Sequence, residues 1–282
     1  MSTASQAITV PYEGVLLSGE QAGEGAPVVL LHGLTATRRY VVMGSRALER
    51  SGHRVIAYDA RGHGRSSPAP APDAYGYERL CGDLHAVLDA AGVDRSLIAG
   101  ASMGAHTAAR FALEHPERVA ALALITPAFD PSAEDQGREL ARWDALERGL
   151  RDDGVEGFVR AYDLRSVPER WRDTVATVLR QRLSEHEHLD AVADALHAVP
   201  RSRPFESLEE LTAITVPALV VASRDDADPG HPLEVGEHYA RAISGARLVV
   251  EDAGSPATSP IAWQGGALSR LLAELASDAG MR

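Results

Sequence analysis

The chain contains a single cysteine, Cys81, and this scarcity excludes an internal disulfide and a thiolate metal cluster. Histidine is more frequent, with 11 residues, but no His-x-x-x-His or Glu-x-x-His pair occurs in a context typical of a metal site. A glycine-rich phosphate loop with its lysine is also missing. We therefore expect neither a metal ion nor an organic cofactor.

Long apolar runs are missing too, since none approaches the ~20 residues needed to cross a bilayer. The N-terminus lacks the basic start and apolar stretch of a secretory signal, which favours a cytoplasmic protein. Positive charge is in the minority, because 28 Lys and Arg face 40 Asp and Glu, for a formal net charge of −12. This balance disfavours nucleic acid or an anionic membrane as a partner. A small-molecule substrate or ligand is expected, and no oligomeric state is predicted.

Short apolar runs alternate with amphipathic segments along most of the chain. This alternation predicts an α/β fold in which a mostly parallel sheet has helices on both faces. The expected strands are 27–31, 54–58, 96–100, 119–125, 217–223 and 247–250, with weaker candidates at 8–10 and 14–17 that would form an antiparallel start. The expected helices are 43–51, 77–91, 103–115, 232–243 and 260–276.

The alternation stops after Asp130-Pro131 and resumes at Val216-Pro217. The stretch between them is rich in arginine, glutamate and leucine at helical spacing and has no convincing strand. It predicts a helical lid, residues 131–205, inserted into an α/β core of residues 1–130 and 206–282. The aromatic residues of the lid that could face a ligand are Trp143, Phe158, Tyr162 and Trp171.

The most informative motif is Gly100-Ala-Ser102-Met-Gly104. It follows an apolar run and precedes a helical pattern, which is the strand–turn–helix context of a nucleophile elbow. Only small residues fit two positions either side of the serine in such a turn, and Gly100 and Gly104 occupy those positions. The context favours Ser102 as a nucleophile at the start of a helix, whose positive end favours an oxyanion. The alternative is a chance turn.

Further motifs follow in a fixed order: Leu30-Leu-His-Gly-Leu34, Tyr58-Asp-Ala-Arg-Gly-His-Gly-Arg-Ser66 and Leu219-Val-Val-Ala-Ser-Arg-Asp-Asp226. Together with the elbow they resemble the α/β-hydrolase superfamily, in its lid-bearing esterase and lactonase branch. The resemblance covers essentially the whole chain apart from the lid. It implies the α/β-hydrolase fold, and it constrains the substrate much less.

The resemblance also implies roles for particular residues. Ser102 would be the nucleophile, and the backbone N–H groups of Leu34 and Met103 would form the oxyanion hole. The histidines of the first two motifs, His32 and His63, belong to structural turns in this family.

The catalytic acid of the family follows a small residue by three positions at the end of a strand. Ser223 and Asp226 reproduce this spacing, so Asp226 is the expected acid. Asp225 and Asp228 are neighbouring alternatives. Any of the three could instead be a solvated turn carboxylate.

The chain departs from the family where the catalytic histidine should follow the last strand. Ser255 occupies that position, and a hydroxyl cannot take the proton from Ser102 at neutral pH. The loop around Ser255 is atypical as a whole, which favours a natural divergence over an engineered residue. His231, five residues after Asp226, is a possible substitute base, and His106, four residues after Ser102, is a second candidate.

Three functions remain open. The first is a serine hydrolase of a carboxylic ester or lactone with a non-standard base, acting by default on a modest, mainly aliphatic acyl group. The second is a catalytically impaired pseudo-hydrolase that binds a small ligand, which the missing histidine favours. The third is a non-hydrolytic lyase or cyclase on the same fold, which nothing in the residues selects positively.

Overall fold

The computed structural model describes residues 4–133, 136–252 and 260–281, and one sheet of eight strands forms its centre. The strands are β1 (Gln6–Tyr12), β2 (Val15–Ala22), β3 (Ala26–Leu31), β4 (His53–Tyr58), β5 (Ser96–Ala101), β6 (Val119–Ile125), β7 (Ala218–Val221) and β8 (Arg247–Val249). They lie in the order β1-β2-β4-β3-β5-β6-β7-β8. β2 pairs antiparallel with β1 and β4, and the remaining neighbours run parallel.

Each apolar run expected as a strand forms one, and the two weak candidates form the antiparallel start. The main helices of the core are α1 (Ala47–Arg50), α2 (Tyr77–Ala90), α3 (Met103–Glu114), α7 (Leu233–Ala242) and α8 (Gly265–Asp278). The helix expected at 43–51 is confined to the short α1. The helix expected from Pro260 begins only at Gly265, after the short 3₁₀ helix η7 (Ile261–Trp263).

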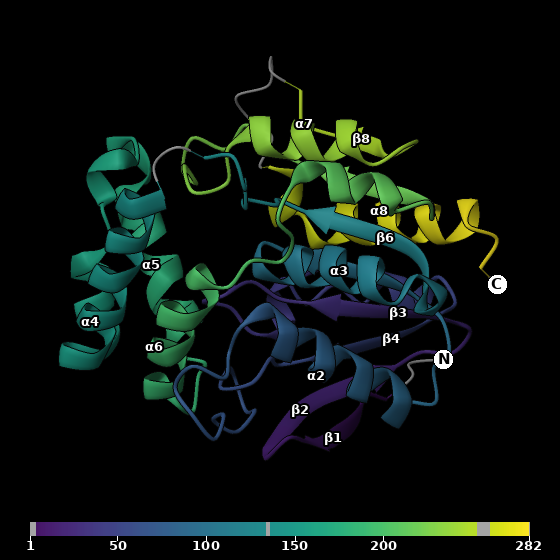
Figure 1. Ribbon diagram of the computed structural model, residues 1–282, viewed down its shortest axis with the longest axis horizontal. Helices are drawn as coiled ribbons and strands as arrows, with labels where there is room; N and C mark the ends of the chain where they lie inside the picture. Colours follow the sequence, from purple (N-terminus) through teal and green to yellow (C-terminus); the bar gives the residue numbers. More distant parts are fainter. Residues whose placement is uncertain (1–3, 134–135, 253–259, 282) are drawn as a thin grey trace.

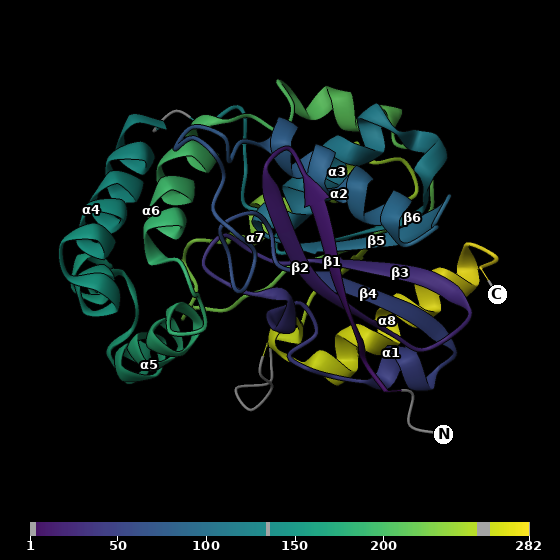
Figure 2. The same ribbon diagram turned by 90° about the horizontal axis from the view of Figure 1, so that it is seen from below.

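Helices cover both faces of the sheet, which confirms the predicted fold class (Figures 1 and 2). The strands supply alternate residues to the two faces, as period-2 geometry requires. Val29 and Ile98 pack with α2, α3 and α7, whereas Val28 and Leu97 pack with α1 and α8. Because both faces are covered, the parallel strands are apolar at almost every position.

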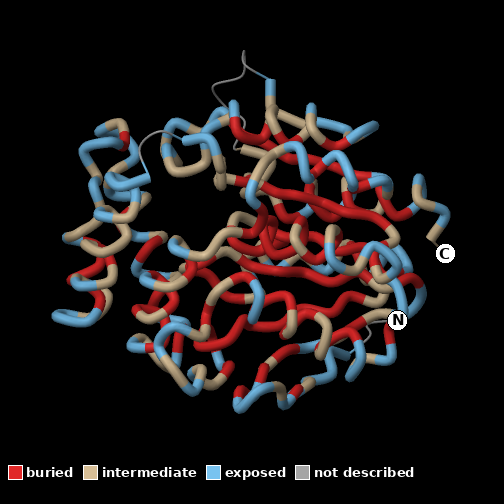
Figure 3. Tube along the Cα trace, viewed as in Figure 1, coloured by how far each residue is buried: buried red, intermediate tan, exposed pale blue. Residues whose placement is uncertain are grey.

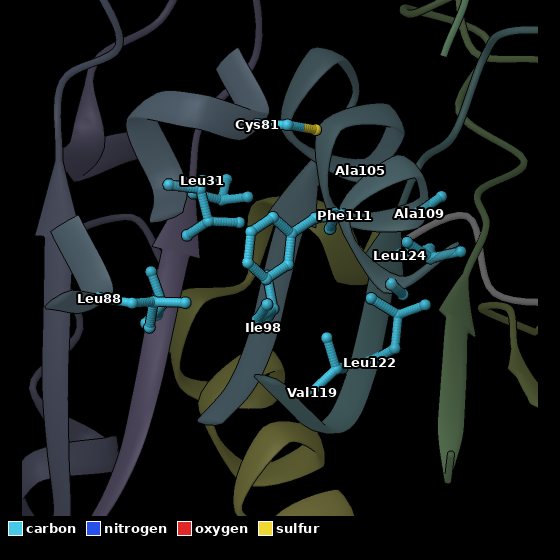
Figure 4. Close-up of a cluster of buried hydrophobic side chains, with 14 of the residues drawn as sticks. Leu31, Cys81, Leu88, Ile98, Ala105, Ala109, Phe111, Val119, Leu122 and Leu124 are labelled. Atoms are coloured by element: carbon cyan, nitrogen blue, oxygen red, sulfur yellow. The ribbon is translucent and has the colours of Figure 1, made fainter. Parts of the chain in front are cut away.

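On the sheet face covered by α2, α3 and α7, Phe111 of α3 lies within a large cluster of buried side chains (Figure 4). Leu31, Ile98 and Leu122 reach this cluster from three strands, and Leu88 reaches it from α2. Removing a ring that is buried in this way costs about 3–5 kcal/mol. The cluster therefore fixes α3, and with it the elbow at its N-terminus, against the middle of the sheet.

A helical insertion separates β6 from β7, and no strand occurs in its described residues. It contains α4 (Gln136–Ala161), α5 (Arg172–Leu183) and α6 (Leu189–Ala198), with a kink in α4 at Asp153 and Gly154. Figures 1 and 2 show these helices gathered beside the sheet, at the end toward which the parallel strands point. The remaining short helices are η1 (Arg38–Tyr40), η2 (Pro116–Arg118), η3 (Leu164–Ser166), η4 (Glu169–Trp171), η5 (Val199–Arg201) and η6 (Leu208–Ala213).

The insertion has an apolar cluster of its own, which continues into the core beside the elbow. Leu146, Phe158 and Leu196 of the insertion pack in one cluster with Leu34 and Met103. The outer surface of the insertion is largely exposed, in contrast to the buried strands (Figure 3). Within the described residues, no helix combines the length and the apolar character needed to cross a membrane.

Candidate active site

The elbow between β5 and α3 has the strained backbone that its sequence predicts. Ser102 has φ 51° and ψ −115°, a conformation that L-residues rarely adopt. A Cβ at Gly100 would overlap the carbonyl of Gly104, and one at Gly104 would overlap the carbonyl of Leu31. Glycine at both positions therefore lets β5 and α3 meet at this angle, with Ser102 half-buried at the turn between them.

The loop after β3 lies directly against the elbow. A Cβ at Gly33 would be 3.4 Å from the Cβ of Ser102, so the backbone that leads to Leu34 passes beside the serine. His32 braces this loop: its Nε2 accepts the Ala60 N–H at 2.9 Å, and its Nδ1–H donates to the Gly33 carbonyl at 2.8 Å. His63 Nε2 lies 2.6 Å from the Leu34 carbonyl oxygen. Both histidines thus have bracing contacts.

A chain of hydrogen bonds joins Ser102 to the loop between β7 and α7. Ser102 Oγ lies 2.8 Å from His231 Nε2, and His231 Nδ1 lies 2.9 Å from Asp228 Oδ2. Because a carboxylate only accepts, Nδ1 carries the imidazole proton and donates it to Asp228. Nε2 is then free to accept the Ser102 hydroxyl proton. This is the connectivity of a serine–histidine–aspartate triad.

Two consecutive turns place Asp228 and His231 on the same side of their loop. The Asp228 N–H donates to the Asp225 carbonyl at 3.2 Å, and the His231 N–H donates to the Asp228 carbonyl at 3.2 Å. Pro229 and Gly230 occupy the middle of the second turn, where both residue types are favoured. The spacing of three residues therefore lets one short loop supply both an imidazole and its carboxylate.

The charges around Asp228 favour its ionised form. Burial opposes ionisation, but the charge and hydrogen bond of His231, with the charges of Arg182 and Arg142, outweigh it and lower the pKa of Asp228 below its usual value. An ionised Asp228 stabilises a protonated His231, because the two charges are opposite and in contact.

The structure separates Asp226, the acid expected by resemblance, from His231. Its carboxylate forms an ion pair with Arg170 of the insertion, and its side chain is 48% exposed, against 25% for Asp228. Asp225 also points elsewhere, because it accepts hydrogen bonds from Trp263 Nε1 and the Ala227 N–H, both at 2.9 Å. Strand-end spacing selects Asp226, whereas the turns bring Asp228 to the imidazole. Asp228 therefore replaces Asp226 as the acid candidate.

The second candidate base, His106, has its ring nitrogens engaged away from the serine. Its Nε2 accepts the N–H groups of Ala128 and Phe129, both at 3.0 Å, and its Nδ1 lies 2.9 Å from the Tyr77 hydroxyl. Burial, followed by the charge of His231, lowers the pKa of His106 to about 3. His106 is thus a neutral brace below the elbow. Ser255, the position where the family places its histidine, lies outside the described residues.

A cavity of about 1170 Å³ lies between the elbow and the helical insertion. Its wall includes Ser102, His231, Leu34 and Met103. It also includes the aromatic residues expected to face a ligand, Trp143, Phe158, Tyr162 and Trp171. No group of three or more metal-ligating side chains occurs in the part of the chain that the structure describes.

Two features of the site were not selected from the sequence. The preference for Asp228 would have followed from asking which carboxylate can reach His231, since Asp228 is its i−3 neighbour across Pro229-Gly230. Arg142 and Arg182 also line the cavity, and both come from the insertion. Nothing in their sequence context distinguishes them from the many other arginines there.

Comparison with known proteins agrees with this architecture. A family model described as "alpha/beta hydrolase fold" matches residues 26–257. The chain is 30% identical over 240 residues to a putative carbamate hydrolase, RutD, of Azorhizobium caulinodans, covering 85% of this chain and 87% of that protein. It is 34% identical over 214 residues to 2-hydroxy-6-oxononadienedioate/2-hydroxy-6-oxononatrienedioate hydrolase 2 of Pseudomonas putida, covering 72% and 73%.

Solved structures share the fold. A thermophilic esterase from Thermogutta terrifontis superposes with a TM-score of 0.77 at 24% identity, covering 97% of this chain and 99% of the esterase. Est816, described as an N-acyl homoserine lactone degrading enzyme, gives a TM-score of 0.72 at 25% identity and covers 96% and 99%. On these matches, together with the sheet order and the elbow, the chain belongs to the α/β-hydrolase fold family and is an enzyme of the hydrolase type.

Proposed function

We propose that the protein is a serine hydrolase of carboxylic esters or lactones, with Ser102 as nucleophile, His231 as general base and Asp228 as the acid. The observation that carries the proposal is the continuous hydrogen-bonded path from Ser102 Oγ through His231 to Asp228, at 2.8 and 2.9 Å. Both distances are within the reach that a nucleophile and its base require.

The reaction begins when Ser102 Oγ attacks the substrate carbonyl carbon and His231 Nε2 takes the hydroxyl proton. The carbonyl π electrons move to oxygen and give a tetrahedral oxyanion. Its collapse breaks the bond to the leaving oxygen, which receives the proton from His231. Water then attacks the acyl-enzyme with His231 again as base, and release of the acid returns the proton to Ser102.

The N–H groups of Met103 and Leu34 are the proposed donors to the oxyanion. Met103 is the first residue of α3, so its N–H has no acceptor within the helix and coincides with the positive end of the helix dipole. Leu34 follows Gly33, which packs against Ser102. Each such donor typically contributes ~10²–10³ in rate.

The relatives support hydrolysis and differ in the bond that their names specify. Those names refer to a carbamate, a dienedioate, an ester and an acyl homoserine lactone. All of these fit attack on an electrophilic carbonyl carbon. We place the present chain with esters and lactones because the wall of the cavity that contains the triad also has an aliphatic part, which includes Leu146, Val175 and Leu179.

The test is hydrolysis of 4-nitrophenyl butyrate by the wild-type chain and by Ser102→Ala, alongside labelling with a fluorophosphonate. Removal of the nucleophile is expected to reduce turnover by roughly 10⁴-fold to 10⁶-fold and to abolish labelling. A protein that only binds a ligand would give neither product nor label. Turnover that survives in Ser102→Ala would assign the chemistry to another group.

A further inference from the structure

The cavity wall contains arginines in two different situations. Several have local partners, since Arg170 pairs with Asp226, Arg201 pairs with Asp144, and Arg203 pairs with Glu206. Arg142 of α4 and Arg182 of α5 also line the cavity, but the described residues give neither of them an ion pair. A partly buried cation without a carboxylate partner is costly, so these two residues need an explanation.

Arg182 contacts two aromatic rings and forms no ion pair with the described residues. Its guanidinium carbon lies 4.7 Å from the ring centroid of Trp263 and 5.4 Å from that of Tyr40. Its Nε is sealed from solvent and has no hydrogen-bond partner within the described residues. Burial lowers the pKa of Arg182 below its usual value even though the charge of Asp228 acts to raise it, so a further negative charge at this guanidinium would stabilise its charged form.

Arg142 has a similar setting on the neighbouring helix. Its guanidinium carbon lies 5.7 Å from the ring centroid of Tyr162, whose hydroxyl it also contacts, and 6.0 Å from that of Trp143. Of these contacts only the one with the Tyr162 hydroxyl uses a guanidinium N–H, and no other acceptor for Arg142 occurs among the described residues. The planar array of guanidinium N–H donors is suited to the two oxygens of a carboxylate.

Both arginines lie on the side of the cavity that holds the triad acid. A Cβ at Gly230 would be 3.7 Å from an Nη atom of Arg142 and 3.6 Å from Asp228 Oδ1. The charge of Arg182 also acts on Asp228. An anion bound between the two guanidinium groups would therefore lie within the same cavity as Ser102, near the His231 end of the site.

We infer that Arg142 and Arg182 form a carboxylate subsite, so that the preferred substrate is an ester or lactone that carries a second, ionised carboxylate. The inference rests on the proposed function, because the subsite and Ser102 would act on one molecule. The triad cleaves the ester bond, and the subsite holds the carboxylate, which undergoes no chemistry. The overall charge of −12 would slow the approach of such a substrate, so its recognition must come from the local arginines.

The competing explanation is that the two arginines serve only Asp228, by keeping it ionised. The two roles predict different effects of the arginine variants on the turnover of a neutral substrate. A carboxylate subsite changes the ratio of anionic to neutral substrate turnover. A purely electrostatic effect on Asp228 lowers turnover of both substrates to the same extent and shifts the pH profile.

The experiment compares kcat/KM for 4-nitrophenyl hemiglutarate, and for 4-butyryloxybenzoate, with kcat/KM for neutral 4-nitrophenyl butyrate. The two anionic esters carry the carboxylate on the acyl side and on the leaving-group side, respectively. Wild type is expected to prefer one of them by tenfold or more. Arg182→Gln and Arg142→Gln should each reduce that preference by roughly ten- to hundredfold, the range expected for a lost hydrogen bond to a charged group.

Arg180→Gln is the matched control, because Arg180 lies on the same helix, pairs with Glu156 and is absent from the cavity wall. It removes the same unit of charge, and we expect it to leave the preference unchanged. Arg182→Lys keeps the charge without the planar fork and should restore only part of the preference. Equal losses on neutral and anionic esters would overturn the subsite and assign the arginines to Asp228.

Failure of the proposed function gives a different result from failure of the carboxylate subsite. If wild type cleaves none of the three esters, binding of monomethyl and dimethyl glutarate to the unmodified chain is measured by calorimetry. Tighter binding of the monomethyl anion, weakened at least tenfold in Arg182→Gln, supports the subsite without any turnover. Equal binding of the two compounds, or binding that Arg182→Gln leaves unchanged, overturns it.

Discussion

The two loops that carry the proposed catalytic groups are built in different ways. The elbow between β5 and α3 is set by its own backbone, through the positive φ of Ser102 and the close approach of Gly100 and Gly104 to neighbouring carbonyls. The loop between β7 and α7 is set by turns and side-chain contacts, including the hydrogen bond from Trp263 to Asp225. A loop that is constrained sterically within a few residues therefore has a recognisable sequence motif. A loop that is held by contacts with distant residues does not.

This difference also bears on the proposed base, His231, which lies on another loop than the histidine of the family pattern. An elbow tolerates almost no substitution, so Ser102 stays where the family has it. A loop without such restrictions can acquire an imidazole wherever geometry allows, provided that a carboxylate is nearby. Asp228-Pro-Gly-His231 meets that condition within four residues.

The largest expected effect is that of His231→Ala. Loss of the base should lower kcat for 4-nitrophenyl butyrate by roughly 10⁴-fold to 10⁶-fold, about as much as Ser102→Ala, because the two groups act as a unit. The measurement is steady-state hydrolysis, with His197→Ala on the exposed side of α6 as the control. Activity that persists in His231→Ala would place the base elsewhere.

The next effect distinguishes the two neighbouring carboxylates. Asp228→Asn should lower kcat by roughly 10³-fold to 10⁴-fold, because an amide neither holds the imidazole in the correct tautomer nor stabilises its charge. Asp226→Asn removes an exposed ion pair worth at most about 1 kcal/mol, so its activity should fall by no more than about fivefold. The reverse order of losses would restore Asp226 as the acid.

Replacing one glycine by alanine in each loop tests whether the elbow is sterically constrained and the loop between β7 and α7 is not. Gly104→Ala forces a Cβ onto the Leu31 carbonyl and should lower the free energy of unfolding by about 3 kcal/mol. Gly230→Ala meets no atom closer than 3.6 Å and should change it by no more than about 0.5 kcal/mol. Urea unfolding of both variants provides the comparison, and similar losses would contradict it.

Acidification should weaken the bracing around the elbow. Burial lowers the pKa of His32, His106 and His186 from 6.5 to about 3. The unfolded chain therefore takes up these protons from 6.5 downward while the folded chain does not, so stability is lost as the pH falls from 6.5 toward 3. Between about pH 7 and about pH 6 the expected loss is about 0.7 kcal/mol per histidine.

The matched variant is His186→Asn, whose amide oxygen can accept the Gly64 N–H that His186 Nδ1 accepts at 2.8 Å. It removes one of the three histidines whose pKa is lowered to about 3, and it should reduce the pH dependence by less than a third, because burial also lowers the pKa of His63. Urea unfolding at several pH values measures the slope. A slope equal to that of the wild type would show that His186 does not contribute.

The sequence by itself determined the fold and the position of the elbow that presents Ser102, the proposed nucleophile. The alternation of apolar runs with amphipathic segments predicted the sheet and its two layers of helices, because a strand buried on both faces needs apolar residues at nearly every position. Gly100 and Gly104 identified the elbow, because the steric requirement acts within a few residues of Ser102. The segment 131–205 was expected to be helical, and its described residues form α4, α5 and α6.

Only the tertiary structure decided which groups meet at Ser102. Strand-end spacing favours Asp226 over Asp228, but the turns of one loop, which Trp263 contacts at Asp225, direct Asp228 to His231. Arg142 and Arg182 line the same cavity from different helices of the insertion. The meeting of these residues depends on strand order and on the packing of distant segments, and no local sequence pattern predicts it.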